Sequence, residues 1–200
     1  MDVVVYGKLG LIFLALALAA CAGRPVPSPT PPPGLMDGEQ QAVYTAALQK
    51  LYPATNYVIM DTTATSPIGV DDTASILGRI LQEMRGVDQK TADSFQLRNE
   101  KTWSVPAGMD LGSFYVLLSQ AEMKQLFSQN QNGWQIFYEQ HPGAPGITSV
   151  SRVGFNDRFD QALVYIGTLS HPLAGEGFIV LLKKINGTWV VDQQVMTWIS

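Results

Sequence analysis

The sequence predicts an α+β domain in which N-terminal helices pack on a C-terminal antiparallel β-meander of about four strands. Three observations predict this class. Apolar residues recur at helical spacing through the first half of the chain. The spacing changes to that of β-strands after a break rich in proline and glycine at residues 141–146. Asn186-Gly187 then forms a two-residue hairpin turn between the last two predicted strands.

Four helices are predicted from apolar spacing and from residues that start or stop a helix. They cover residues 37–52, 71–86, 89–98 and 119–127. Asp37 begins the first helix with a pattern like a capping box. Asp71 or Asp72 caps the second, and the helix dipole explains an acidic pair there without a catalytic role. Ser119 and Glu122 form the capping box of the last helix.

Six segments are predicted to be strands because they are short, apolar and rich in β-branched or aromatic residues. They cover residues 57–60, 114–118, 147–153, 160–167, 177–184 and 188–198. We expect the last four to be antiparallel neighbours. We also expect the helices to cover one face of the resulting sheet.

Leu18-Ala19-Ala20-Cys21 closes a short apolar run and contains the only cysteine of the sequence. The run is about a dozen residues long, which suits a signal peptide and is too short to span a bilayer. The motif resembles the lipobox of bacterial lipoproteins, in which the cysteine receives lipid and becomes the first residue of the mature chain. An ordinary cleaved signal peptide, with Cys21 unmodified, is the alternative.

The predicted organisation has three parts. They are a signal peptide at 1–20, lipidated Cys21 with a proline-rich stalk over 21–35, and a single globular domain at 36–200. The lipobox implies that acyl chains on Cys21 hold the protein on the extracytoplasmic face of the cell membrane. In bacteria with two membranes, an aspartate directly after the lipidated cysteine retains a lipoprotein in the inner membrane. This chain has Ala22 at that position, so in such a cell the outer membrane is also a possible location.

Two further resemblances concern the folded part. Helices followed by an antiparallel meander are similar to the cystatin and nuclear-transport-factor-2-like (NTF2-like) superfold, which implies a curved sheet around a long helix and a conical pocket. The C-terminal third resembles a group of uncharacterised bacterial envelope proteins, and this implies a shared fold but no catalytic residue. The segments that carry the second resemblance are 151–156, 161–165, 175–177, 183–189 and 196–200.

Composition and motifs exclude several classes of protein. The formal net charge of −4 and the lack of a basic cluster argue against a nucleic-acid partner. The sequence has no serine-nucleophile elbow, phosphate-binding glycine loop or zinc-binding histidine pattern, so we expect no cofactor and disfavour an enzyme. His141 and His171 are expected in exposed loops. The loop 156–160 has the oxygen ligands of a calcium site, but Arg158 opposes a cation and an ordinary turn is favoured.

Arg152 and Tyr165 are the candidate ligand-binding residues. Arg152 is predicted inside a strand beside buried positions, where its charge needs a partner such as Glu139 or Asp192. The sequence is compatible with two roles of Arg152, a structural ion pair and the recognition of an anion in a pocket. The large aromatic residues are expected mainly in the core, with an apolar-ligand platform as the alternative. They are Trp103, Trp134, Trp189, Trp198, Tyr115, Tyr138 and Tyr165.

We therefore expect a lipid-anchored, non-enzymatic domain that binds an envelope protein or a cell-wall component. The alternative is an NTF2-like protein whose pocket binds or turns over a small apolar molecule. The pocket protein predicts a cavity between the sheet and the helices, with Arg152 or Tyr165 in its wall. The interaction module predicts a filled core and an exposed apolar patch of several hundred Å². Hydrolysis by His141 or His171 is a third hypothesis.

Replacing Cys21 with serine tests the predicted anchor. We expect Cys21→Ser to abolish incorporation of labelled palmitate and to release the chain from the membrane fraction, because acyl chains then no longer contribute to membrane binding. Labelling and fractionation of cells that produce either chain measure both effects. Palmitate on the variant, or none on the wild-type chain, would contradict the lipoprotein prediction.

Overall fold

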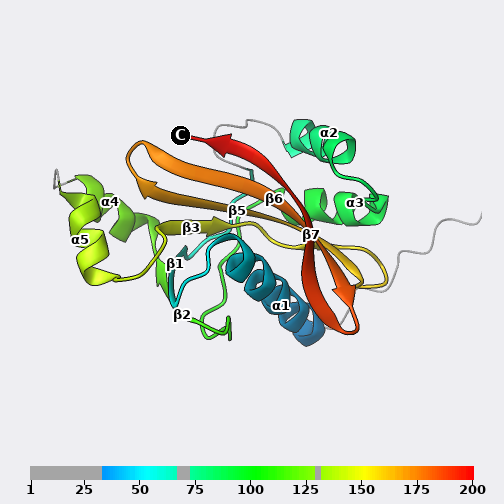
Figure 1. The fold of residues 1–200 in the computed structure, drawn as a ribbon, viewed down its shortest axis with the longest axis horizontal. Helices are drawn as coiled ribbons and strands as arrows, with labels where there is room; N and C mark the ends of the chain where they lie inside the picture. The colour runs from blue at the N-terminus through cyan, green and yellow to red at the C-terminus, as the bar shows by residue number, and fades with distance from the viewer. Residues whose placement is uncertain (1–32, 67–72, 129–131) are drawn as a thin grey trace, which may run out of the picture. The chain divides into compact units, whose positions relative to one another are not determined.

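A computed structural model describes residues 33–66, 73–128 and 132–200, which lie in one compact unit that spans Pro31–Ser200. These residues form five helices and seven strands (Figure 1). The helices are α1 (Pro33–Leu51), α2 (Thr73–Glu83), α3 (Gln89–Arg98), α4 (Gln120–Ser128) and α5 (Gly133–Gln140). The strands are β1 (Asn56–Met60), β2 (Phe114–Leu118), β3 (Ile147–Val150), β4 (Gly154–Phe155), β5 (Gln161–His171), β6 (Ala174–Ile185) and β7 (Thr188–Ile199).

The seven strands join one sheet in the order β2-β1-β3-β5-β6-β7, with β4 paired to β5. β3, β5, β6 and β7 are antiparallel neighbours, which confirms the predicted meander. The helices precede this meander in the chain, so the α+β class is confirmed as well. β1 pairs in parallel with both β2 and β3, and this extension of the sheet was not predicted.

The turn between β6 and β7 has the predicted hairpin geometry. Asn186 and Gly187 have positive φ angles of 51° and 84°, as a type I′ turn requires at both central residues. Ile185 pairs with Thr188 directly across the turn. Asparagine and glycine adopt positive φ at little cost, so this pair fixes where the last hairpin begins.

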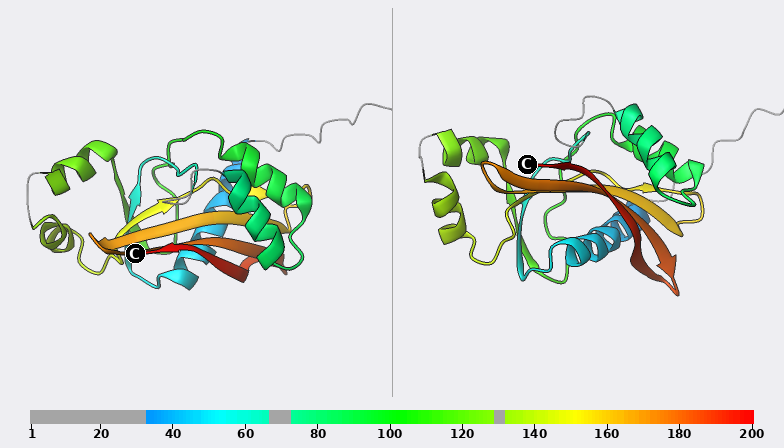
Figure 2. Two further views of the ribbon diagram at one scale, coloured as in Figure 1. Left: turned by 90° about the horizontal axis from the view of Figure 1, so that it is seen from above. Right: turned by 45° about the horizontal axis from the view of Figure 1, so that its top comes forward.

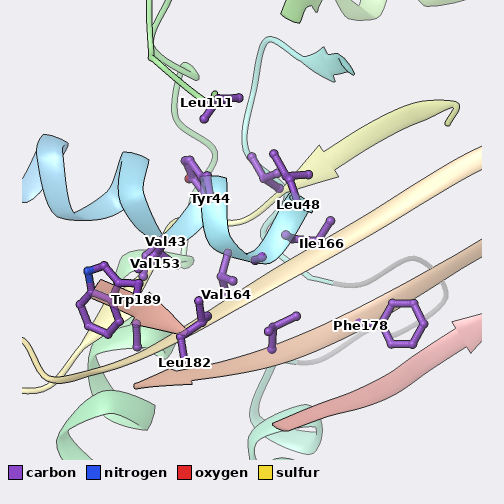
Figure 3. Packing of buried hydrophobic residues seen from close by; sticks show 14 of the residues in the cluster. Val43, Tyr44, Leu48, Leu111, Val153, Val164, Ile166, Phe178, Leu182 and Trp189 are labelled. Atoms are coloured by element: carbon purple, nitrogen blue, oxygen red, sulfur yellow. The ribbon is translucent and has the colours of Figure 1, made fainter. Parts of the chain in front are cut away.

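Helices cover both faces of the sheet, whereas we expected them on one face (Figures 1 and 2). Along β5, Val164 belongs to the cluster that contains α1, while Leu163 and Tyr165 belong to the cluster that contains α2 and α3. Figure 3 shows the side of the core that faces α1. The prediction was wrong because β5 and β6 carry continuous apolar runs, and such runs are typical of strands that are buried on both faces.

Two helix predictions differ from the structure. α1 begins at Pro33, ahead of Asp37 and inside the range assigned to the stalk. Proline is well tolerated in the first turn of a helix because the N–H that it lacks would have no helical partner there. α5 was not predicted at all, since its eight residues are too few to display a helical period. Asp71 and Asp72, the predicted cap of the second helix, lie outside the described residues.

Arg152 lies between β3 and β4, not inside the single strand predicted over 147–153. The side chain of Asn99 takes the place of a neighbouring strand. Its Oδ1 accepts a hydrogen bond from the backbone N–H of Arg152 at 2.8 Å, and its Nδ2 donates to the carbonyl of Arg152 at 2.9 Å. The strand is interrupted because this amide satisfies the backbone groups that a ladder would otherwise use.

One carboxylate ties α1 to the β6–β7 hairpin. Glu39 accepts hydrogen bonds from the Lys184 ammonium and from Trp189 Nε1, the latter at 2.6 Å. Further along the helix, Tyr44 donates to the carbonyl of Ser151 at 2.7 Å in the buried core. Polar contacts at two positions along α1, in addition to apolar packing, therefore hold this helix on its face of the sheet.

β7 places Trp198 over glycines of β6, its neighbour in the sheet, and of β5, the next strand. A Cβ added to Gly177 would lie 2.0 Å from Trp198 Nε1, and one added to Gly175 would lie 2.8 Å from Cη2. Gly167, the partner of Gly177 in β5, lies beside the same ring. The indole N–H donates to the Tyr165 hydroxyl at 2.9 Å. These glycines are needed for the close approach of the indole to the sheet.

Gly177→Ala is expected to lower the free energy of unfolding by about 1–3 kcal/mol, because its methyl group would overpack against Trp198. Gly78→Ala is the matched control. Gly78 lies in α2 with no atom within 4 Å of an added Cβ, and alanine there should stabilise the helix by about 0.5–1 kcal/mol. Urea unfolding followed by circular dichroism measures both changes. Equal effects of the two substitutions would contradict the packing role of Gly177.

Candidate ligand-binding groove

Tyr165, one of the two predicted ligand-binding residues, is part of the packed core. Its side chain is 1% exposed and lies with the residues of α2 and α3. The Tyr165 hydroxyl accepts the hydrogen bond of Trp198. The space between the sheet and these helices, where the alternative hypothesis of a pocket protein places a cavity, is therefore filled by side chains at the position of Tyr165.

Arg152, the other predicted residue, packs against an aromatic ring. Its guanidinium carbon lies 4.6 Å from the centre of the Trp103 ring, which is the geometry of a cation–π contact. The two proposed carboxylate partners bind elsewhere. Glu139 accepts from Gln135 Nε2 at 2.9 Å, and Asp192 forms an ion pair with Lys183, also at 2.9 Å.

A surface groove of about 740 Å³ lies between α4, α5 and the end of the β5–β6 hairpin. Its wall is chiefly apolar and aromatic. The lining residues are Gln120, Ala121, Met123, Lys124, Phe127, Gly133, Trp134, Leu169, His171 and Pro172. None of these residues is acidic. The groove therefore combines apolar contact surface with a small number of polar side chains.

Aromatic packing holds α5 against α4 and β5. The ring centre of Trp134 lies 4.8 Å from that of Phe127. Trp134 also stacks on His171, with 6.3 Å between the ring centres and 19° between the planes. Tyr138 donates a hydrogen bond to the carbonyl of Ser170 at 2.8 Å, and burial raises its pKa. These contacts give the groove a preformed aromatic wall.

The predicted capping box at the start of α4 is confirmed. Glu122 accepts hydrogen bonds from the backbone N–H of Ser119 at 2.8 Å and from its hydroxyl at 2.6 Å. Ser119 Oγ in turn accepts from the N–H of Glu122 at 3.2 Å. The hydrogen bonds from Ser119 hold the pKa of Glu122 below its usual range. This acid therefore secures the beginning of the helix that forms one wall of the groove.

The expectation that both histidines lie in exposed loops holds for each only in part, since His141 is outside helices and strands but half-buried, and His171 is exposed but belongs to β5. His171 is the exposed last residue of β5 and lines the groove. His141 is half-buried directly after α5. Within the described residues, neither imidazole has a hydrogen-bond partner, and no group of three or more potential metal ligands occurs. The geometry gives no support to hydrolysis by either histidine.

The oxygen-rich loop 156–160 forms the turn between β4 and β5. The Asp160 carboxylate accepts from Arg158 Nε at 2.8 Å and from Asn156 Nδ2 at 2.6 Å, and these bonds lower its pKa. Asn156 Oδ1 accepts from the backbone N–H groups of Asp160 and Gln161. The side-chain oxygens thus serve the turn, as the favoured interpretation predicted.

Two smaller concavities have different chemistry. One, of about 330 Å³, is lined largely by polar residues that include Tyr52, Thr168 and Glu176. The other, of about 430 Å³, is lined by aliphatic residues together with Glu122, His141 and two glutamines. The 740 Å³ groove is the largest of the three and has the aromatic wall, so it is the candidate site.

No protein family model, curated protein or solved structure matches this chain. The resemblances to the NTF2-like superfold and to the envelope proteins therefore stay predictions. Among the described helices, none is long and apolar enough to cross a membrane. The case for a binding site rests on the geometry of the groove.

Most of the groove residues were not predicted as site residues. Trp134 was expected only among several aromatic residues, mainly in the core. Met123, Phe127 and Leu169 were not predicted to belong to a site. One signal was available. Met123 and Phe127 are four residues apart in a predicted helix, and every described residue of that helix remains at least partly exposed. An apolar pair on a short, poorly buried helix indicates a surface that lacks full cover.

Tyr165→Phe tests the structural role of a residue that we had expected in a ligand site. The change leaves the indole N–H of Trp198 without this acceptor, so the free energy of unfolding should fall by about 1–2 kcal/mol. The affinity of the groove for N-phenyl-1-naphthylamine, a neutral aromatic probe whose fluorescence rises in apolar surroundings, should be unchanged. Urea unfolding and a fluorescence titration measure the two effects. Weaker probe binding at unchanged stability would contradict this assignment.

Proposed function

We propose that this protein is a lipid-anchored, non-enzymatic binding domain of the cell envelope, and that the groove takes up a small, largely apolar molecule. The observation that carries the proposal is the 740 Å³ volume with an aromatic wall. Ligand sites typically enclose about 300–1,000 Å³ and have apolar walls with a few placed polar groups. The groove agrees with this description in both size and chemistry.

The shape of the surface favours a small ligand over the envelope protein that the sequence suggested as a partner. Large exposed apolar side chains outside the groove are spread over several elements and include Leu97 on α3, Phe114 on β2 and three residues of β7, which are Val190, Met196 and Ile199. The groove instead gathers its apolar side chains around one concave volume. A concave site can surround a small molecule, whereas a protein partner needs a broader contact surface.

The proposed anchor supports the same function. Apolar molecules partition into bilayers, and acyl chains on Cys21 would hold the domain beside that reservoir. The domain would then meet its ligand at a concentration higher than that in the surrounding water. A lipid anchor and an apolar groove are therefore mutually consistent properties.

The groove can be tested on a chain of residues 31–200. The described members of all three hydrophobic clusters lie within this compact unit, so we expect it to fold by itself. N-phenyl-1-naphthylamine, a neutral aromatic probe that fluoresces in apolar surroundings, should bind saturably at one site. Trp134→Ala should weaken this binding about tenfold or more, because aromatic anchors dominate binding energies. Ala121→Trp should also weaken it by filling the groove from an exposed helix position.

Phe114→Ala is the control for Trp134→Ala. Phe114 is 68% exposed on β2 and does not line the groove, so its loss should leave the affinity for the probe unchanged. Circular dichroism establishes that each variant is folded. The proposal fails if the wild-type chain shows no saturable binding, or if Phe114→Ala weakens binding as much as the two groove variants do.

A further inference from the structure

We infer that the ligand of the groove is an amphipathic anion, a single molecule with an apolar body and one acidic group that is taken up from solution. The inference rests on the proposed function, because it names the class of ligand for the same groove. The charged and hydrogen-bonding side chains that border the apolar wall carry it.

Lys124 is the one lysine among the lining residues, which include no arginine and no acid. It follows Met123 and precedes Phe127 by three positions, so it lies on the side of α4 that faces the groove. Lys124 is exposed, and no carboxylate of the described residues lies within 4.0 Å of its ammonium group. Glu122, the one acid of α4, is bound to Ser119. The ammonium is therefore available to a ligand.

His171, at the end of β5, adds a second polar group to the lining of the groove. Its imidazole stacks on Trp134, and a stacked ring directs its nitrogens along the ring plane, away from the indole face. No described residue hydrogen-bonds to these nitrogens. An acidic group between α4 and β5 can thus accept hydrogen bonds from Lys124 and His171 while the apolar body contacts Trp134.

The charge of the whole chain makes this arrangement selective. The formal net charge is −4, so the protein as a whole repels anions. The groove nevertheless has an ammonium group and no acid in its wall. A neutral ligand would gain no charge–charge attraction from Lys124, and a cationic ligand would be repelled by it. An amphipathic anion is the class of ligand for which both the apolar wall and the charge of Lys124 contribute to the affinity.

Two probes with the same aromatic skeleton test the inference on residues 31–200. 8-Anilino-1-naphthalenesulfonate (ANS) differs from N-phenyl-1-naphthylamine by one sulfonate. We expect the wild-type chain to bind ANS more tightly than the neutral probe. Lys124→Glu should weaken ANS binding about tenfold or more, because it removes a charge-assisted hydrogen bond and adds repulsion. The same change should leave the affinity for the neutral probe within about twofold.

Two further variants make the test specific. His171→Phe keeps a ring that can stack on Trp134 and removes the nitrogens, so it should weaken the binding of ANS more than that of the neutral probe. Lys90→Glu is the matched control for Lys124→Glu, because Lys90 is exposed in α3 and does not line the groove. It should change the affinity for neither probe.

The outcomes separate the inference from the proposed function. Equal wild-type affinities for the two probes, or equal losses of both in Lys124→Glu, would overturn the anionic ligand while the groove remains a site. If the wild-type chain bound neither probe saturably, the proposed function itself would be overturned. Lys124-dependent binding to phosphatidylglycerol vesicles without a one-to-one ANS complex would identify a membrane surface as the partner, and would also overturn the inference.

Discussion

The structure depends on the burial of β5 and β6 on both faces. Residues 162–166 of β5 and 178–182 of β6 are all buried. Successive side chains of a strand point to opposite faces, so α1 must cover one face while α2 and α3 cover the other. Full burial of one such side chain contributes about 1.5–3 kcal/mol relative to exposure. Neither helical layer can therefore leave the sheet without a large loss of stability.

This constraint moves the binding site away from the centre of the molecule. The core beside the sheet is occupied by residues such as Tyr165 and Trp198, which pack over Gly167 and Gly177. The outer end of the sheet has less cover. There α4 and α5 are short, and the described side chains of α4 are exposed or half-buried. A groove forms at this end because two short helices and a hairpin meet there without filling the space between them.

The features that could be predicted from the sequence are those that a short stretch of residues determines by itself. The helix 89–98 and the strand 114–118 were predicted with the bounds observed, and the Asn186-Gly187 turn was predicted with its geometry. The parallel pairing of β1 with β3 brings Val58 to Ile147, and no local pattern encodes such a contact. The break at Arg152 likewise depends on the distant side chain of Asn99. Of the candidate site, the helix 119–127, His171 and the aromatic character of Trp134 were evident, but the contact between Trp134 and His171 requires the whole fold.

The wall of the groove and its polar groups make different physical contributions. Apolar contact with Trp134, Phe127 and Met123 supplies affinity that depends little on the identity of the ligand. Lys124 and His171 can supply discrimination, because a charge left without its partner costs free energy when a ligand covers it. Such a division suits the proposed place beside a bilayer. Neutral apolar molecules are abundant there, so selection of one class of ligand must come from the polar groups and not from the wall.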